Sequence, residues 1–106
     1  MKVAFLAGPY RGDFQERCRN IIAAKKVAKK YWAQGFAVIC PHMNSSGFDG
    51  IERVCPTKFT EGYLEILRRC DTIIIMSTWH GSAGATAELH KAQELDLEII
   101  YDEDDE

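Results

Sequence analysis

Glu88 and the small residues that precede it form the part of this sequence best suited to chemistry. Residues 81–88 read Gly-Ser-Ala-Gly-Ala-Thr-Ala-Glu and follow an apolar run at 72–76. Small side chains let a ligand approach the backbone, and the free N–H groups that begin a helix bind phosphate, so Ser82 and Gly84 are binding candidates. A carboxylate at position 88 could attack a sugar carbon or stabilise a cation that develops there. The alternative is a plain strand-to-helix turn in which Ser82 caps the helix and Glu88 complements its dipole.

A second segment with two glycines follows the first apolar run of the chain. Residues 8–13 are Gly-Pro-Tyr-Arg-Gly-Asp. The glycines permit unusual backbone angles, and Arg11 can pair with a phosphate through two hydrogen bonds. Tyr10 can stack on a base or orient a sugar and is the second catalytic candidate beside Glu88; the alternative is a tyrosine packed on the helix and an arginine in solvent. The binding candidates of this segment are Gly8, Pro9, Arg11 and Gly12.

The elements that position these residues follow from the hydrophobic pattern. Strands are predicted at residues 2–7, 36–40, 72–76 and 97–101, and helices at 13–35, 57–69 and 85–95. Their alternation predicts a parallel sheet with right-handed crossovers. We therefore expect an α/β fold, a flavodoxin- or Rossmann-like open parallel sheet of about four strands in the order 2-1-3-4, with helices on both faces.

The predicted strand order also predicts where a ligand binds. Ligands of open α/β sheets bind outside the carboxyl ends of the strands, at the point where the strand order reverses. In this sheet that point lies between the first and third strands, and the segments 8–13 and 77–84 both fall there. This coincidence favours the chemical interpretation of both segments over the plain one.

The helix predicted at 13–35 has a start signal, an apolar face and a basic face. Asp13 and Glu16 have the spacing of a capping box. The apolar positions at helical spacing are Phe14, Cys18, Ile21, Ala24, Ala28 and Trp32. The lysines lie mostly on the solvated side, and we interpret them as a solubility feature rather than a nucleic-acid site. They are Lys25, Lys26, Lys29 and Lys30.

Length and charge limit the domain organisation and the kinds of partner that the protein could have. One domain is expected over residues 1–101, followed by an acidic disordered tail at 102–106. Removing these five acids from the 16 in the chain leaves 11 against 13 basic residues, and the acidic tail argues against a nucleic-acid polymer as partner. No apolar run reaches membrane-spanning length and the N-terminus lacks the pattern of a secretory signal, so a cytoplasmic protein without a membrane partner is expected.

The cysteines and the long connection after residue 41 complete the candidates. The four cysteines form no Cys-x-x-Cys pair, and reduced thiols are expected. Cys40 and His42 could supply two metal ligands, but no further ligand is evident, so no metal is expected. No dinucleotide or Walker motif is present, and no cofactor is expected. Residues 42–56 are expected to form a long loop that is mobile or closes over a ligand, with His42 and Asn44 as binding candidates.

Several of these segments together resemble the nucleoside 2-deoxyribosyltransferase superfamily. They are residues 6–9 (Leu-Ala-Gly-Pro), the pair Cys70-Asp71 before the isoleucines, and Gly84 to Glu88. Over nearly the whole chain the sequence is most similar to small phage and bacterial proteins grouped near that superfamily, the DUF4406 kind. The Gly-x-x-Arg-Gly pattern at 8–12 and the Ser-x-Gly-x-x-x-Glu pattern at 82–88 resemble those of the 2′-deoxynucleoside 5′-monophosphate N-glycosidase branch.

This resemblance implies hydrolysis of an N-glycosidic bond, or 2-deoxyribosyl transfer, on a deoxynucleoside 5′-monophosphate or a deoxynucleoside. It implies that Ser82 and Gly84 hold the 5′-phosphate and that Glu88 is the nucleophile that forms a glycosyl-enzyme. It also implies a homodimer or a larger homo-oligomer. The family's catalytic aspartate falls on Tyr63 here, with Glu61 the nearest acid, which leaves the general acid open. A non-catalytic, nucleotide-binding sensor protein of the same fold is therefore the alternative function.

Overall fold

Four parallel strands form one sheet in the order β2-β1-β3-β4. The structure is a computed structural model that describes residues 1–45 and 56–103. The strands are β1 (Val3–Ala7), β2 (Ala37–Ile39), β3 (Thr72–Ile75) and β4 (Glu98–Tyr101). The two central strands are paired in register, with Phe5 opposite Ile73 and Ala7 opposite Ile75. The predicted strand order and direction are confirmed.

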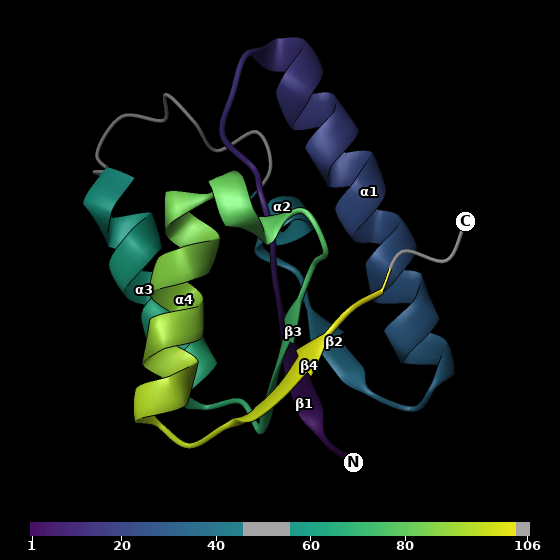
Figure 1. The fold of residues 1–106 in the computed structure, drawn as a ribbon, viewed down its shortest axis with the longest axis vertical. Coiled ribbons are helices and arrows are strands. Elements are labelled where there is room, and N and C mark those ends of the chain that lie inside the picture. The colour runs from purple at the N-terminus through teal and green to yellow at the C-terminus, as the bar shows by residue number, and fades with distance from the viewer. Residues whose placement is uncertain (46–55, 104–106) are drawn as a thin grey trace.

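Helices cover both faces of this sheet, as predicted (Figure 1). The helix α1 (Phe14–Ala33) lies on one face, and α3 (Pro56–Arg68) and α4 (Ala83–Glu94) lie together on the other. A one-turn 3-10 helix, η1 (Trp79–Gly81), precedes α4. The prediction of a loop directly after β2 is wrong, because Pro41 begins a short helix, α2 (Pro41–Asn44). The rest of the predicted long loop, residues 46–55, lies outside the described residues.

The core is divided between the two faces of the sheet by the alternation of side chains along the strands. Phe5, Ile73 and Ile75 pack with residues of α3 and α4. Leu6 and Ile74 point the other way and pack with residues of α1. Each of these five side chains is fully buried. Full burial of a side chain of this size stabilises a fold by about 1.5–3 kcal/mol, so the two central strands anchor both layers.

The helix α1 begins as predicted but turns a different face to the core. Asp13 caps it, and the reciprocal hydrogen bonds between Asp13 and Glu16 form a capping box. Its buried residues are Ala24, Ala28 and Tyr31. The expected core positions Phe14 and Trp32 are instead 72% and 54% exposed. Successive helical residues are about 100° apart, so the burial of Tyr31 turns Trp32 away from the sheet.

Asp102 belongs to the folded domain, unlike the solvated tail that was expected to begin there. Its N–H donates to the carbonyl of Ile75 at 2.8 Å, which continues the ladder between β3 and β4 by one residue. The buried carboxylate then accepts hydrogen bonds from Lys30 Nζ and the Tyr31 hydroxyl, both at 2.9 Å. Lys30 is therefore a partner of the core rather than part of the solvated face. The acidic residues 104–106 lie outside the described residues.

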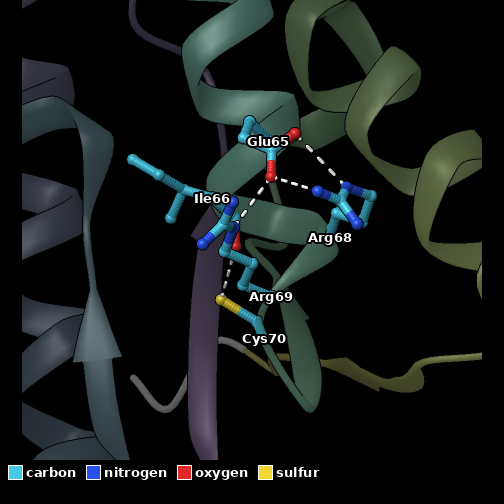
Figure 2. Close-up of polar contacts among 5 residues, drawn as sticks. All are labelled: Glu65, Ile66, Arg68, Arg69 and Cys70. Carbon is cyan, nitrogen blue, oxygen red and sulfur yellow. Dashed lines mark hydrogen bonds and ion pairs between the residues drawn. The ribbon is translucent and has the colours of Figure 1, made fainter.

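The connection between α3 and β3 lies at the amino ends of the strands. In Figure 2, Glu65 binds the guanidinium groups of Arg68 and Arg69, and the Cys70 thiol donates to the carbonyl of Ile66 at 3.3 Å. Burial raises the pKa of the Cys70 thiol to about 11. The next residue, Asp71, accepts a hydrogen bond from the Val3 N–H at 2.8 Å. Asp71, which directly precedes β3, therefore links the start of β3 to the start of β1.

Cys18, Cys40 and Cys70 are free thiols. None of the described helices is both long and apolar enough to span a lipid bilayer.

Candidate functional site

The segments after β1 and β3 come together at the carboxyl ends of these strands. The Met76 N–H donates to the Ala7 carbonyl at 2.9 Å, so the segments that follow β1 and β3 leave the sheet side by side. A Cβ atom on Gly8 would lie 2.3 Å from Met76 Sδ. Gly8 is thus required by close packing and not, as expected, by an unusual backbone angle. In Figure 1 the segment that follows β1 and the beginning of α4 lie at the same end of the molecule.

The end of the first segment is shaped by Gly12 and leaves Arg11 accessible. Gly12 has a φ of +154°, and a Cβ atom there would lie 2.8 Å from Glu16 Cβ. Its conformation therefore requires glycine, as predicted. Arg11 is exposed, and it makes no hydrogen bond or ion pair with another residue in the described ranges. Its guanidinium is available to a phosphate or another anion.

The ring of Tyr10, within this segment, contacts the ring of His42 from α2. His42 is buried, and its Nε2 lies 2.6 Å from the carbonyl oxygen of Pro9. Burial lowers the pKa of His42, so the imidazole is neutral at pH 7. The ring of Tyr10 meets the ring of His42 edge to face, with centroids 5.7 Å apart. His42 was expected to bind substrate, and the structure places it behind the segment that would do so.

Asn44 lies in a different place, at a cavity between α2 and α3. Its Nδ2 donates to the Tyr63 hydroxyl at 3.2 Å, and Tyr63 donates to Ser45 Oγ at 2.6 Å. The cavity has a volume of about 190 Å³. Its lining residues are Asn44, Ser45, Lys58, Phe59, Gly62, Tyr63 and Ile66. This cavity was not predicted from the sequence, although the spacing of positions 59, 62, 63 and 66 indicates one face of α3.

Ser82 begins α4 as its N-cap. Its Oγ accepts from the Ala85 N–H at 3.1 Å, and the Thr86 hydroxyl donates to the Ser82 carbonyl at 2.8 Å. The plain reading of Ser82 as a helix cap is confirmed. The Ser82 hydroxyl hydrogen can still be donated to a ligand. A Cβ atom added to Gly84 would meet only Ser82 Oγ, at 4.0 Å, so there is open space beside this backbone.

Glu88 lies on the inward side of α4. The stripe that it shares with Ala85, Leu89 and Ala92 packs toward the sheet and α3, and these three residues are buried. Burial raises the pKa of the Glu88 carboxyl to about 8. Within residues 1–45 and 56–103, no side chain or backbone group forms a hydrogen bond or ion pair with it. A desolvated carboxyl group without a partner is destabilising, and such groups are concentrated at functional sites.

Metal ligands do not gather in the part of the chain that the structure describes. No group of three or more His, Cys, Asp or Glu side chains there could hold a metal ion. The pair considered from the sequence, Cys40 and His42, has Sγ and Nδ1 3.8 Å apart, but the other imidazole nitrogen faces the Pro9 carbonyl.

The comparison with known proteins gives a family and a fold. The family described as "Domain of unknown function (DUF4406)" matches residues 1–101. No curated protein matches the sequence.

Two solved structures are similar to this one over most of its length. A 2-deoxyribosyltransferase from Bacillus psychrosaccharolyticus matches with a TM-score of 0.66 and 18% identity, over 93% of this chain and 70% of that one. A 2-deoxyribosyltransferase from Leishmania mexicana matches with a TM-score of 0.67 and 16% identity, over 95% of this chain and 63% of that one. At these identities the likeness shows a common fold, on a chain shorter than either enzyme.

Proposed function

This chain belongs to the DUF4406 family, and we propose that it binds a deoxynucleoside 5′-monophosphate or deoxynucleoside and breaks its N-glycosidic bond. The observation that carries the proposal is the environment of Glu88, a partly buried carboxyl group without a partner among the described residues. It lies within two helical turns of the N-cap Ser82 and the open backbone at Gly84. A helix start can bind the 5′-phosphate of a nucleotide. A carboxyl group further along the same helix can then lie near C1′ of its sugar.

The proposed reaction has two steps at C1′ of the sugar. A carboxylate oxygen of Glu88 forms a bond to C1′ while the C1′–N bond breaks, and the base leaves with that electron pair. Water or a second base then attacks C1′ and releases the Glu88 carboxylate, and the proton that the attacking group loses goes to the departed base, which gives hydrolysis or transfer. The phosphate would be held by the Ser82 hydroxyl, the first N–H groups of α4 and Arg11. One helical turn advances about 5.4 Å, comparable to the step from a 5′-phosphate to the sugar ring.

The cavity between α2 and α3 is the candidate site for the base. Tyr63, which lines it, packs against the same core cluster as Ala85 and Leu89, the neighbours of Glu88 on α4. The amide of Asn44 and the hydroxyl groups of Ser45 and Tyr63 provide polar partners for the edge of a heterocycle. A volume of about 190 Å³ is small, which favours a base over a larger group.

A nucleotide sensor without catalysis is the second candidate function, and Tyr63 is the observation that favours it. The resemblance places the family's catalytic aspartate at this position, and the Tyr63 hydroxyl is already bonded to Ser45 and Asn44. A phenol is a weaker acid than a carboxyl group for protonating a leaving base. A protein that kept the phosphate site but not this acid would bind nucleotides and release them unchanged.

We propose further that the protein acts in the cytoplasm as a homodimer or larger homo-oligomer. Three large apolar side chains on α1 are more than half exposed: Phe14, Ile22 and Trp32. Contact with a second copy would remove these side chains from water. Light scattering on the purified protein tests this, and a monomer at 100 μM would contradict it.

Incubation of the purified protein with each deoxynucleoside monophosphate, followed by chromatography for free base, tests the main proposal. Glu88→Gln should abolish release of the base and leave nucleotide affinity within a few-fold. Ser82→Ala should weaken binding by roughly 1 kcal/mol, the value of one hydrogen bond. Glu94→Gln, on the outer end of the same helix, is the matched control and should behave as wild type. Equal cleavage by Glu88→Gln would overturn the nucleophile assignment, and binding without cleavage would establish the sensor.

A further inference from the structure

Two side chains from different helices hold the backbone of the segment between β1 and α1. His42 Nε2 lies 2.6 Å from the carbonyl oxygen of Pro9, and Asn20 Nδ2 lies 3.1 Å from the carbonyl oxygen of Tyr10. A carbonyl oxygen can only accept, so both nitrogens donate. Two successive peptide groups are therefore tied down, one from α2 and one from α1.

The donor on His42 is itself oriented by a neighbour. Because Nε2 carries the hydrogen and the imidazole is neutral, Nδ1 presents a lone pair. The Sγ atom of Cys40 lies 3.8 Å from Nδ1, so the thiol donates to it. Burial raises the pKa of Cys40 and lowers that of His42, which keeps both groups in the forms that this chain of donors requires.

His42 also contacts the side chain of the segment that it holds. Its ring meets the ring of Tyr10 at an interplanar angle of 84°. His42 is 3% exposed, so it supports both the Pro9 peptide and the Tyr10 ring from the protein interior. A ligand on the outer side of the segment would meet Tyr10 and Arg11 and would not touch His42.

We propose that His42 and Asn20 are positioning residues, which hold residues 9–11 in the conformation that receives the nucleotide. This inference rests on the proposed function, because it assigns to these residues a share of the affinity of that site. Without the two donors the segment would have to be ordered when the ligand binds, and that ordering weakens affinity. We expect the loss of either donor to weaken nucleotide binding about tenfold, the equivalent of one net hydrogen bond.

Substitutions that remove or restore the donor test the proposal. His42→Leu removes both hydrogen bonds of the imidazole, and His42→Gln keeps an amide nitrogen that can reach the Pro9 carbonyl. Asn20→Leu removes the second donor from a helix surface that is only partly buried. His90→Leu makes the same chemical change at an exposed position of α4 and is the control.

The first readout is the backbone order of Tyr10 and Arg11 without ligand, measured as NMR order parameters of their amides, with the amides of β3 as an internal reference. The order parameters should fall in His42→Leu and Asn20→Leu, stay unchanged in His90→Leu, and lie close to wild type in His42→Gln. Those of β3 should stay at the value of a rigid backbone. Unchanged order parameters at residues 10 and 11 in both leucine variants would overturn the anchoring.

The second readout is the dissociation constant of a deoxynucleoside monophosphate by calorimetry. It should rise about tenfold in both leucine variants and return to within threefold of wild type in His42→Gln. A looser segment with unchanged affinity in Asn20→Leu would overturn the positioning role. If the order parameters of β3 also fall in His42→Leu, that variant has lost its fold and Asn20→Leu alone decides. If wild type binds no deoxynucleotide, the proposed function fails and the positioning role with it, while the order parameters still decide whether the two donors anchor the segment.

Discussion

Replacing Glu88 by glutamine should stabilise the fold at neutral pH, even though it removes the proposed nucleophile. The carboxyl group is on the inward side of α4, and burial raises its pKa from 4.5 to about 8. In the unfolded chain it would ionise with its ordinary pKa. Between these two values the folded protein holds a proton that the unfolded chain has released, so the free energy of unfolding falls as the pH rises.

The size of the effect follows from this difference in pKa. Each pH unit between the two values is worth about 1.4 kcal/mol, so the cost at pH 7 is roughly 3 kcal/mol. It is absent below pH 4.5 and reaches its maximum above pH 8. Glutamine has the same shape and does not ionise. The advantage of Glu88→Gln over wild type should therefore grow from near zero at pH 4 to roughly 3 kcal/mol at pH 7.

Urea unfolding at several pH values between 4 and 8, followed by tryptophan fluorescence, measures this directly. Trp79 is partly buried and packs on the core beside α4, so its emission reports the transition. Glu94→Gln is again the matched control, because within residues 1–45 and 56–103 Glu94 forms only an exposed pair with Lys91. Groups that titrate in both proteins, such as His42, contribute equally to both free energies of unfolding, so their contributions cancel in the difference between Glu88→Gln and wild type. A difference between Glu88→Gln and wild type that does not change with pH would refute the reasoning.

Three further predictions concern other groups. If Glu88 is the nucleophile, kcat/KM for base release should rise with pH up to about 8, because attack requires the carboxylate; a rate that falls over this range would contradict the role. Asp102→Ala should destabilise the fold by about 2–3 kcal/mol in urea, since Lys30 and Tyr31 lose a buried partner, whereas the exposed Glu103→Ala should not. The groove of about 660 Å³ along α1, lined by Ile22 and the lysines 25, 26, 29 and 30, should bind no DNA at micromolar concentration in a filter assay at low salt. Salt-sensitive binding would contradict the assignment of lysines 25, 26 and 29 to a solvated face.

Local patterns in the sequence were sufficient for the elements and their order. The run Ile73-Ile74-Ile75 marks a strand buried on both faces, and the Asp13/Glu16 spacing marks a helix start, because both signals involve residues a few positions apart. Strands that alternate with helices leave few topologies for a short chain, which is why the order 2-1-3-4 was predictable. Ser82 as the cap of α4 also follows from neighbours within three residues.

The candidate site depends on contacts between distant parts of the chain, which only the tertiary structure decides. The sequence identifies Gly8 as unusual, but the reason is the side chain of Met76, 68 residues further on, which the pairing of β1 with β3 brings against it. His42 has the chemistry of a ligand-binding residue, yet packing buries it behind Pro9. Asp102 is one of five consecutive acids by sequence, and the lysine and tyrosine of α1 make it a core residue. For Glu88 the residue type sets the ordinary pKa, while the depth of α4 against the sheet and α3 sets the shifted one, because desolvation is a property of the surroundings.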